Sequence, residues 1–191
     1  MTLADTTATA SSESKLLYSA TMSLDGYIAG VGGDMSWLTG YLASGPEIDE
    51  LAASIGALLV GKRTFLGDDP NRGTDAEGAF SGTWHGPSIV LTHEPLPTDD
   101  PNLIFADDLE QAVATAKEAA AGKYVNVLGA DVARQCLDAG LLDEVLVLIA
   151  PVLLGDGTRL LDCPGGTKIR LEPVDERHAS GPARLSFRVG R

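Results

Sequence analysis

The clearest chemical signal in the sequence is a glycine that separates a β-prone run from a helical pattern. Residues 125–128 form the β-prone run, Gly129 follows, and Asp131 stands where a helix N-cap or a first-turn carboxylate belongs. Such a turn lets backbone N–H groups approach a phosphate, and the start of the helix adds the positive end of its dipole. The segment predicts a phosphate site, although such turns also occur in proteins that bind no nucleotide.

A second candidate for phosphate binding is the basic turn at residues 61–64, GKRT, which follows a predicted strand at residues 57–60. Its backbone N–H groups and the Thr64 hydroxyl could take a phosphate, and Lys62 or Arg63 could pair with a ribose 2′-phosphate. The same residues also fit a solvated basic turn without a ligand. On the residues alone, both interpretations stay open.

Asp25 and Trp37 have the chemistry expected at the reacting end of a pocket. Asp25 precedes Gly26, and an Asp-Gly pair forms turns for conformational reasons alone. A carboxylate at that place could also bind or protonate an imine or carbonyl substrate. Trp37 fits ordinary core packing equally well. Both residues are therefore hypotheses for substrate contact.

The periodicity of apolar residues predicts alternating strands and helices, which would bring these residues to one sheet. Strands are predicted at residues 16–22, 57–60, 88–92, 103–105, 125–128 and 145–149, the last ended by Pro151. Three helices are predicted. The first covers residues 47–56 and ends at Gly56, the second begins after an N-cap at Asp107, and the third runs from Asp131 to Gly140. Residues 67–87 should form a long loop, and residues 167–174 with 183–189 an antiparallel hairpin. These elements predict a mixed sheet.

The composition limits the class of protein. The chain has 191 residues, 27 acids, 14 bases and a formal net charge of −13, without a cluster of Lys and Arg, so we reject nucleic acid as the main partner. We expect a disordered tail at residues 1–14 and one domain at residues 15–191. Two cysteines without C-x-x-C spacing indicate a reducing cytoplasm, and the lack of about 18 consecutive apolar residues indicates a soluble protein. The histidines lack metal-like spacing, so no metal site is predicted.

Four segments together resemble the dihydrofolate reductase-like superfamily, specifically the branch that includes the reductase domain of riboflavin biosynthesis. They are SATMSLDGYIAG at residues 19–30, ALLVGKRTF at 57–65, SIVLTH at 88–93, and VLGADVARQCLDAGLLDEVLVLIAPVLLGDG at 127–157. The resemblance implies a three-layer α/β/α fold with a mixed, mostly parallel central sheet and a C-terminal antiparallel hairpin. It also implies NADPH-dependent hydride transfer to a C=N or C=O bond of a small pterin- or pyrimidine-like substrate.

The resemblance also implies which residues contact cofactor and substrate. Asp25 would be the catalytic residue and would bind the substrate together with Ile28 and Trp37. The implied NADPH-binding residues are Ala20, Ile28, Ala29, Gly61, Lys62, Arg63, Thr64, Leu91, Thr92, His93, Leu128, Gly129, Ala130, Asp131 and Val132.

The sequence departs from a true dihydrofolate reductase at two places. The acid that follows the tryptophan in that enzyme is replaced here by residues 39–42, TGYL, and the arginine that grips the folate tail is absent from residues 82–87, GTWHGP. We therefore expect a reductase that does not act on folate. The alternative is a non-catalytic nucleotide-binding or interaction protein that retains the fold. A homodimer whose interface completes the pocket is also expected, from the apolar run at residues 145–149 and from the relatives.

Overall fold

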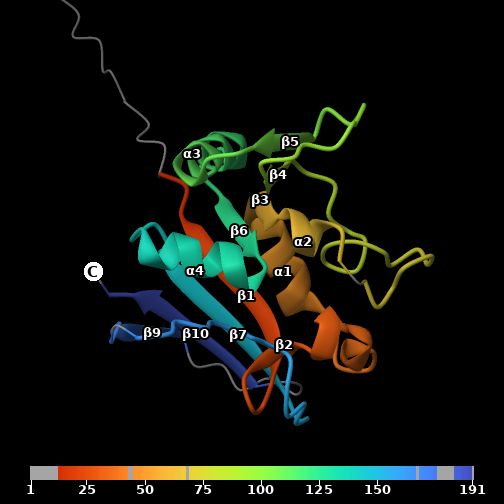
Figure 1. The fold of residues 1–191 in the computed structure, drawn as a ribbon, viewed down its shortest axis with the longest axis vertical. Helices are drawn as coiled ribbons and strands as arrows, with labels where there is room; N and C mark the ends of the chain where they lie inside the picture. The colour runs from red at the N-terminus through yellow and green to blue at the C-terminus, as the bar shows by residue number, and fades with distance from the viewer. Residues whose placement is uncertain (1–12, 43–44, 68, 167, 176–182, 191) are drawn as a thin grey trace, which may run out of the picture.

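The core of the molecule is one eight-stranded mixed sheet. The computed structural model describes residues 13–42, 45–67, 69–166, 168–175 and 183–190. The strand order is β5-β4-β3-β6-β1-β7-β10-β9 (Figure 1). The strands are β1 (Leu16–Ser23), β3 (Ile55–Gly61), β4 (Ser88–Leu91), β5 (Leu103–Ala106), β6 (Tyr124–Leu128), β7 (Glu144–Ala150), β9 (Leu171–Asp175) and β10 (Ala183–Val189).

The direction of the strands confirms the predicted mixed, mostly parallel sheet. Strands β5, β4, β3, β6, β1 and β7 pair in parallel, whereas β10 is antiparallel to both β7 and β9. β9 and β10 are the predicted C-terminal hairpin, although its Gly-Pro turn lies outside the described residues. Because β7 lies between β1 and β10, burial inside the sheet accounts for its apolar sequence.

Helices cover both faces of the sheet, as the three-layer prediction requires. The helices are α1 (Pro46–Ser54), α2 (Lys62–Phe65), α3 (Leu109–Ala120) and α4 (Ala130–Asp138), with 3₁₀ turns η1 (Val31–Gly33) and η2 (Ser36–Leu38). α3 and α4 bury side chains such as Val113 and Cys136 in the larger core on one face. Leu51 of α1 packs with Trp84 in the smaller core on the other face. Figure 1 shows α4 in front of the sheet.

Two predicted helix ends differ from the structure. α1 ends at Ser54, not at Gly56, and Gly56 lies inside β3. A Cβ at Gly56 would overlap the Ala120 backbone of α3, so this glycine permits close packing of helix on sheet rather than ending a helix. At α3 the N-cap is Asp108 rather than Asp107, because the Asp108 carboxylate accepts from Gln111 N–H at 2.9 Å.

Two short strands form outside the main sheet, in segments where the sequence analysis predicted no strand. β2 (Tyr27–Ala29) pairs antiparallel with β8 (Thr158–Arg159). The Arg159 guanidinium lies over the Tyr27 ring, 4.9 Å from its centroid. A Cβ at Gly157 would overlap the Ala29 carbonyl oxygen. The segment after β1 is therefore fixed against the segment that follows β7.

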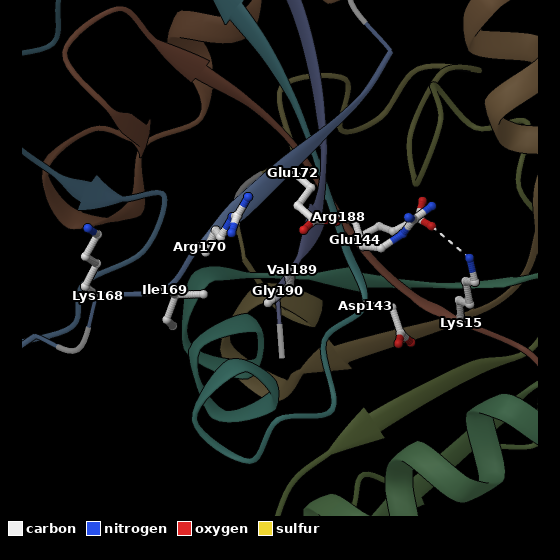
Figure 2. Close-up of a pocket in the computed structure, with 10 residues that line it drawn as sticks. All are labelled: Lys15, Asp143, Glu144, Lys168, Ile169, Arg170, Glu172, Arg188, Val189 and Gly190. Carbon is white, nitrogen blue, oxygen red and sulfur yellow. Dashed lines mark hydrogen bonds and ion pairs between the residues drawn. The ribbon is translucent and has the colours of Figure 1, made fainter.

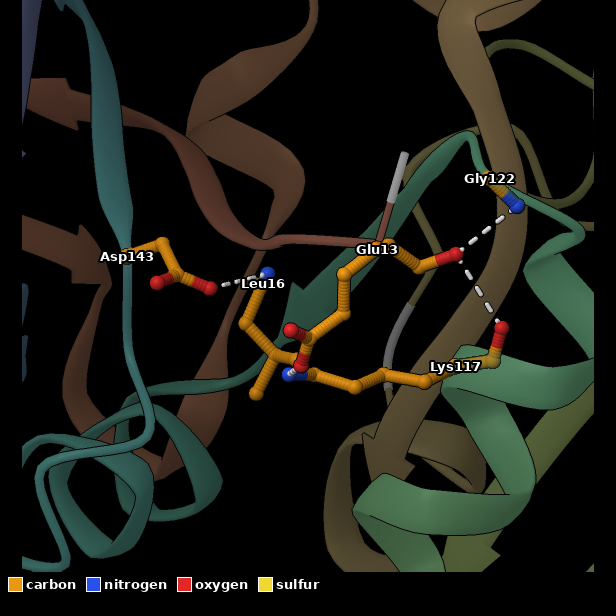
Figure 3. Close-up of polar contacts among 6 residues, drawn as sticks. Glu13, Leu16, Lys117, Gly122 and Asp143 are labelled. Atoms are coloured by element: carbon orange, nitrogen blue, oxygen red, sulfur yellow. Dashed lines mark hydrogen bonds and ion pairs between the residues drawn. The ribbon is translucent and has the colours of Figure 1, made fainter. Parts of the chain in front are cut away.

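The described chain begins with a network that ties the N-terminal segment to α3 (Figure 3). Ser14 Oγ donates to the Lys117 carbonyl at 3.1 Å and accepts from Gly122 N–H at 2.9 Å, and Glu13 pairs with Lys117 Nζ at 2.9 Å. Ser14 is buried. Residues 1–12 of the predicted tail lie outside the described residues, whereas Glu13 and Ser14 belong structurally to the domain.

Candidate active site

The predicted cofactor segments meet at one edge of the sheet. Gly61 at the end of β3 is in register with Leu91 at the end of β4, and Val60 is in register with Leu128 at the end of β6. Because these strands are parallel, residues 61–64, 91–93 and 128–132 follow the carboxyl ends of adjacent strands. Ligands in open α/β sheets bind beyond such strand ends.

The turns after β3 and β6 are in direct contact. Gly129 has φ of 95°, and a Cβ there would overlap the Thr64 hydroxyl. A Cβ at Gly61 would lie 3.0 Å from Val132 Cγ2. Close packing and a left-handed backbone therefore require glycine at position 129.

The start of α4 offers backbone donors without a side-chain cap. Gly129 is the N-cap and makes no side-chain capping bond. The amides of residues 130–132 have no acceptor within the helix, as at any helix start. The Asp131 carboxylate does not cap them, because it accepts from Arg134 at 3.3 Å and from Gln135 at 3.1 Å along the helix. These amides are suited to an anion.

The basic turn and the end of β4 are joined by an ion pair. Lys62 Nζ lies 2.8 Å from Glu94 Oε2, and this contact lowers the pKa of the Glu94 carboxyl. Thr92 Oγ1 accepts from Glu94 N–H at 3.1 Å, which forms a tight turn. Arg63 and His93 are exposed. Glu94 was not predicted from the sequence, because residue type and spacing do not reveal a pairing across 32 positions.

Asp25 is held as an anion between two loops. Its carboxylate accepts from Ser23 Oγ at 2.5 Å, from Leu154 N–H at 3.1 Å and from Gly155 N–H at 2.7 Å. The bond from Ser23, followed by the backbone bonds, lowers the pKa of Asp25 to about 2. A carboxylate with this pKa accepts hydrogen bonds at neutral pH and holds no proton to donate.

The two tryptophans each carry a buried N–H group. Trp37 lies in η2 and contacts Tyr41 with ring centroids 6.5 Å apart. Trp84 packs in the smaller core at 6.5 Å from Phe80. Both indole Nε1 atoms are buried and have no hydrogen-bond partner in the described part of the chain. Each indole N–H is therefore a buried donor that the described residues leave unpaired.

A polar pair inside the sheet was missed by the sequence analysis. Asn126 is fully buried in β6, its Oδ1 accepts from Ser19 Oγ at 2.8 Å, and its Nδ2 has no partner among the described residues. The signal was an asparagine within an apolar strand. Asn126 belongs to the face that carries Leu17 and Leu58, its neighbours in register.

The remaining predicted residues lie beside these segments. Ala20 in β1 packs against the larger core, as Val132 does. Ile28 is half-buried and Ala29 is buried in β2. Leu91 and Leu128 are half-buried and pack against the larger and the smaller core, respectively.

A large cavity lies at the opposite edge of the sheet and contains none of the predicted site residues (Figure 2). Its volume is about 620 Å³, and it lies beside the starts of β1 and β7 and the end of β10. Two of its charged side chains form an ion pair, in which Lys15 Nζ lies 3.0 Å from Glu144 Oε1. Size alone does not identify it as the active site.

Within the described ranges, no three His, Cys, Asp or Glu side chains come together as a metal site would need. The helices found in that same part of the chain are too short or too polar to cross a membrane. Cys136 is buried in the larger core and Cys163 is exposed, and both are free thiols.

The sheet order and the layered helices define a domain of the dihydrofolate reductase-like class. A dihydrofolate reductase from Enterococcus faecalis, solved with NADP(H), superposes with a TM-score of 0.57, covering 94% of this chain and 99% of its own, at 15% identity. The chain belongs to the RibD C-terminal domain family, whose family model matches residues 14–180. The resemblance stated from the sequence is thereby confirmed.

One curated protein and two further solved structures are similar to this chain. The riboflavin biosynthesis protein RibD of Haemophilus influenzae is 27% identical over 80% of this chain and 51% of its own length, so the chain spans about half of that curated relative. A putative riboflavin biosynthesis protein from Shewanella sp. PV-4 superposes with a TM-score of 0.69 at 18% identity, covering 93% of this chain and 99% of its own. A diaminohydroxyphosphoribosylaminopyrimidine deaminase/5-amino-6-(5-phosphoribosylamino)uracil reductase from Thermotoga maritima gives a TM-score of 0.65 at 19% identity, covering 93% of this chain and 57% of its own.

Proposed function

We propose that this chain is an NADPH-dependent reductase that reduces a C=N or C=O bond of a small pyrimidine- or pterin-like molecule. Membership of the RibD C-terminal domain family supports a reductase of pyrimidine type. The observation that carries the proposal is the meeting of residues 61–64, 91–93 and 128–132 at one sheet edge, where the start of α4 leaves backbone amides without a side-chain cap. Nucleotide phosphates are bound at such strand ends.

The residues at this edge fit a phosphorylated dinucleotide. The uncapped amides at the start of α4 would hold the pyrophosphate, and Lys62 and Arg63 would face the ribose 2′-phosphate. Thr64, Thr92 and His93 add donors beside them. When bound, the cofactor would supply the hydride through its nicotinamide ring.

The reacting end would be formed by residues on the other side of the same edge. Ala29 in β2 is small enough for close approach, and the apolar side chain of Ile28 would exclude water. The Trp37 indole N–H would donate to an acceptor on the substrate. We assign Asp25 the role of a fixed anion that binds the substrate and holds the loops after β1 and β7 together. The proton for the reduced bond would come from water or another acid, because Asp25 is deprotonated.

The activity is tested by NADPH oxidation with pterin, pyrimidine and simple carbonyl substrates. Substrate-dependent oxidation that the double variant Lys62→Ala/Arg63→Ala slows with NADPH far more than with NADH would support the proposal. Equal losses with the two cofactors would refute the role assigned to these two cations.

The second candidate function is a nucleotide-binding or interaction protein without catalysis. It is favoured by the lack of an acid at residues 39–42 and by the low pKa of Asp25, which removes the only predicted proton donor. Nucleotide binding without turnover of any substrate class would support this alternative. Turnover that disappears in Asp25→Ala would exclude it.

We also propose a homodimer located in the cytoplasm, acting on a small molecule. Leu171 and Val174 are exposed on the edge strand β9, and a second copy could cover them. Sedimentation equilibrium tests the association. A mass corresponding to one chain at micromolar concentration would rule it out.

A further inference from the structure

The ion pair between Lys62 and Glu94 lies where two predicted cofactor segments meet. Lys62 is the first residue of α2, directly after β3, and Glu94 follows the end of the neighbouring strand β4. Gly61 and Leu91 are in register, so the two side chains extend from adjacent strand ends. Lys62 Nζ and Glu94 Oε2 are 2.8 Å apart. The cation assigned to the ribose phosphate therefore already has an anionic partner.

Hydrogen bonds fix the backbone of Glu94, whereas its side chain is exposed to solvent. Thr92 N–H donates to the Ala106 carbonyl at 2.7 Å, and Thr92 Oγ1 accepts from Glu94 N–H at 3.1 Å and donates to its carbonyl at 3.3 Å. The Glu94 side chain is 85% exposed, compared with 28% for Lys62. The carboxylate is thus presented to Lys62 by a rigid turn, and it can rotate into solvent at small cost.

We propose that Glu94 is a specificity-determining residue that competes with a ribose 2′-phosphate for the ammonium group of Lys62. The proposal rests on the function proposed above. A phosphate monoester brings close to two negative charges, which Glu94 repels and which need the charge of Lys62. A ribose with a free 2′-hydroxyl brings no charge, and a carboxylate is a suitable acceptor for it. Glu94 therefore weakens the binding of NADPH and reduces the difference in affinity between NADPH and NADH.

Arg63 is a second cation that can bind the phosphate while Glu94 competes for Lys62. It neighbours Lys62, is exposed, and makes no ion pair within the part of the chain that the structure describes. Its guanidinium remains available to the phosphate while Lys62 is shared with Glu94. Arg63 and Lys62 would therefore contribute unequally to the affinity for the 2′-phosphate, and Glu94 determines how much Lys62 contributes.

The test compares 2′,5′-ADP with 5′-AMP, which differ only in the 2′-phosphate and undergo no redox chemistry. Their dissociation constants are measured by calorimetry for the wild type, for Glu94→Gln, and for Glu118→Gln, which removes the same charge from an exposed position on α3. Glu94→Gln should tighten 2′,5′-ADP binding by roughly three- to tenfold, the effect of one nearby surface charge, and leave 5′-AMP within about twofold. Glu118→Gln should change neither.

The outcomes separate this inference from the proposed function. If the wild type binds neither nucleotide, the proposed function and this inference both fail. If it binds both and Glu94→Gln leaves their ratio unchanged, only the role of Glu94 is overturned. A carboxyl titration by NMR gives a readout without nucleotide: the Glu94 pKa, low beside Lys62, should rise in Lys62→Met. An unchanged pKa would show that the pair does not form and would overturn the inference.

Discussion

Asp25 illustrates how hydrogen bonds set the chemistry of a single residue. The sequence placed a carboxylate in a turn and left open whether it served conformation, binding or protonation. Its bonds to Ser23 Oγ and to the amides of Leu154 and Gly155 favour the charged form. The side chain is therefore better suited to holding a loop and a substrate than to giving up a proton.

The titration of Asp25 should follow from these bonds. Carboxyl NMR should give a midpoint at about 2, well below the usual ~3.9 for an aspartate. Since the pKa is lowered on folding, the stabilisation is present above the unfolded pKa and is lost as the pH falls toward about 2. Asp25→Asn should lower the melting temperature at neutral pH, whereas the exposed control Asp99→Asn should not. A midpoint near 4 would contradict this account.

The polar pair of Ser19 and Asn126 should cost stability. Asn126 Nδ2 is buried without a partner among the described residues, and such a group destabilises the folded state. We expect the double variant Ser19→Ala/Asn126→Leu to raise the free energy of unfolding by about 1 kcal/mol in urea denaturation. Asn126→Ala alone should destabilise, because it leaves a cavity. A double variant less stable than the wild type would show that the pair is satisfied.

At the level of elements, glycine is required at the two ends of α4 for different physical reasons. Gly129 combines φ of 95° with contact to Thr64, whereas Gly140 has φ of 68° and open space around its Cβ position. Alanine at either position would be destabilised by backbone strain of roughly 1 kcal/mol, because φ is positive. Only at Gly129 would its Cβ also overlap the Thr64 hydroxyl. Gly129→Ala should therefore lose at least about 1 kcal/mol more than Gly140→Ala in urea denaturation. Equal losses would mean that Thr64 moves aside freely.

The same glycines show what the sequence could and could not predict. The pattern of strand, Gly129, helix and Gly140 was recognised because each signal is local, and the structure confirms the strand, the helix and its C-terminal glycine. Gly56 was wrongly predicted to end a helix. The contact that requires glycine there is with Ala120 of α3, which is far away in the sequence, so no local pattern reveals it. The pairing of β2 with β8 was missed for the same reason.

For the whole molecule, the sheet places two polar regions at opposite edges. The carboxyl ends of the parallel strands gather residues 61–64, 91–93 and 128–132, and the other edge carries the cavity beside Lys15 and Glu144. With a net charge of −13, the molecule repels anions at long range, so local donors must account for any phosphate binding. The parallel topology brings those donors together at one edge.

The central claim is that this edge binds NADPH, and a fluorescence titration tests it most directly. Trp37 and Trp84 serve as reporters while purified protein is titrated with NADPH and, separately, with NADH. The account predicts micromolar affinity for NADPH, about −8 kcal/mol, and weaker binding of NADH. Failure of both cofactors to bind at millimolar concentration would contradict the reductase function and would leave the family fold without its proposed chemistry.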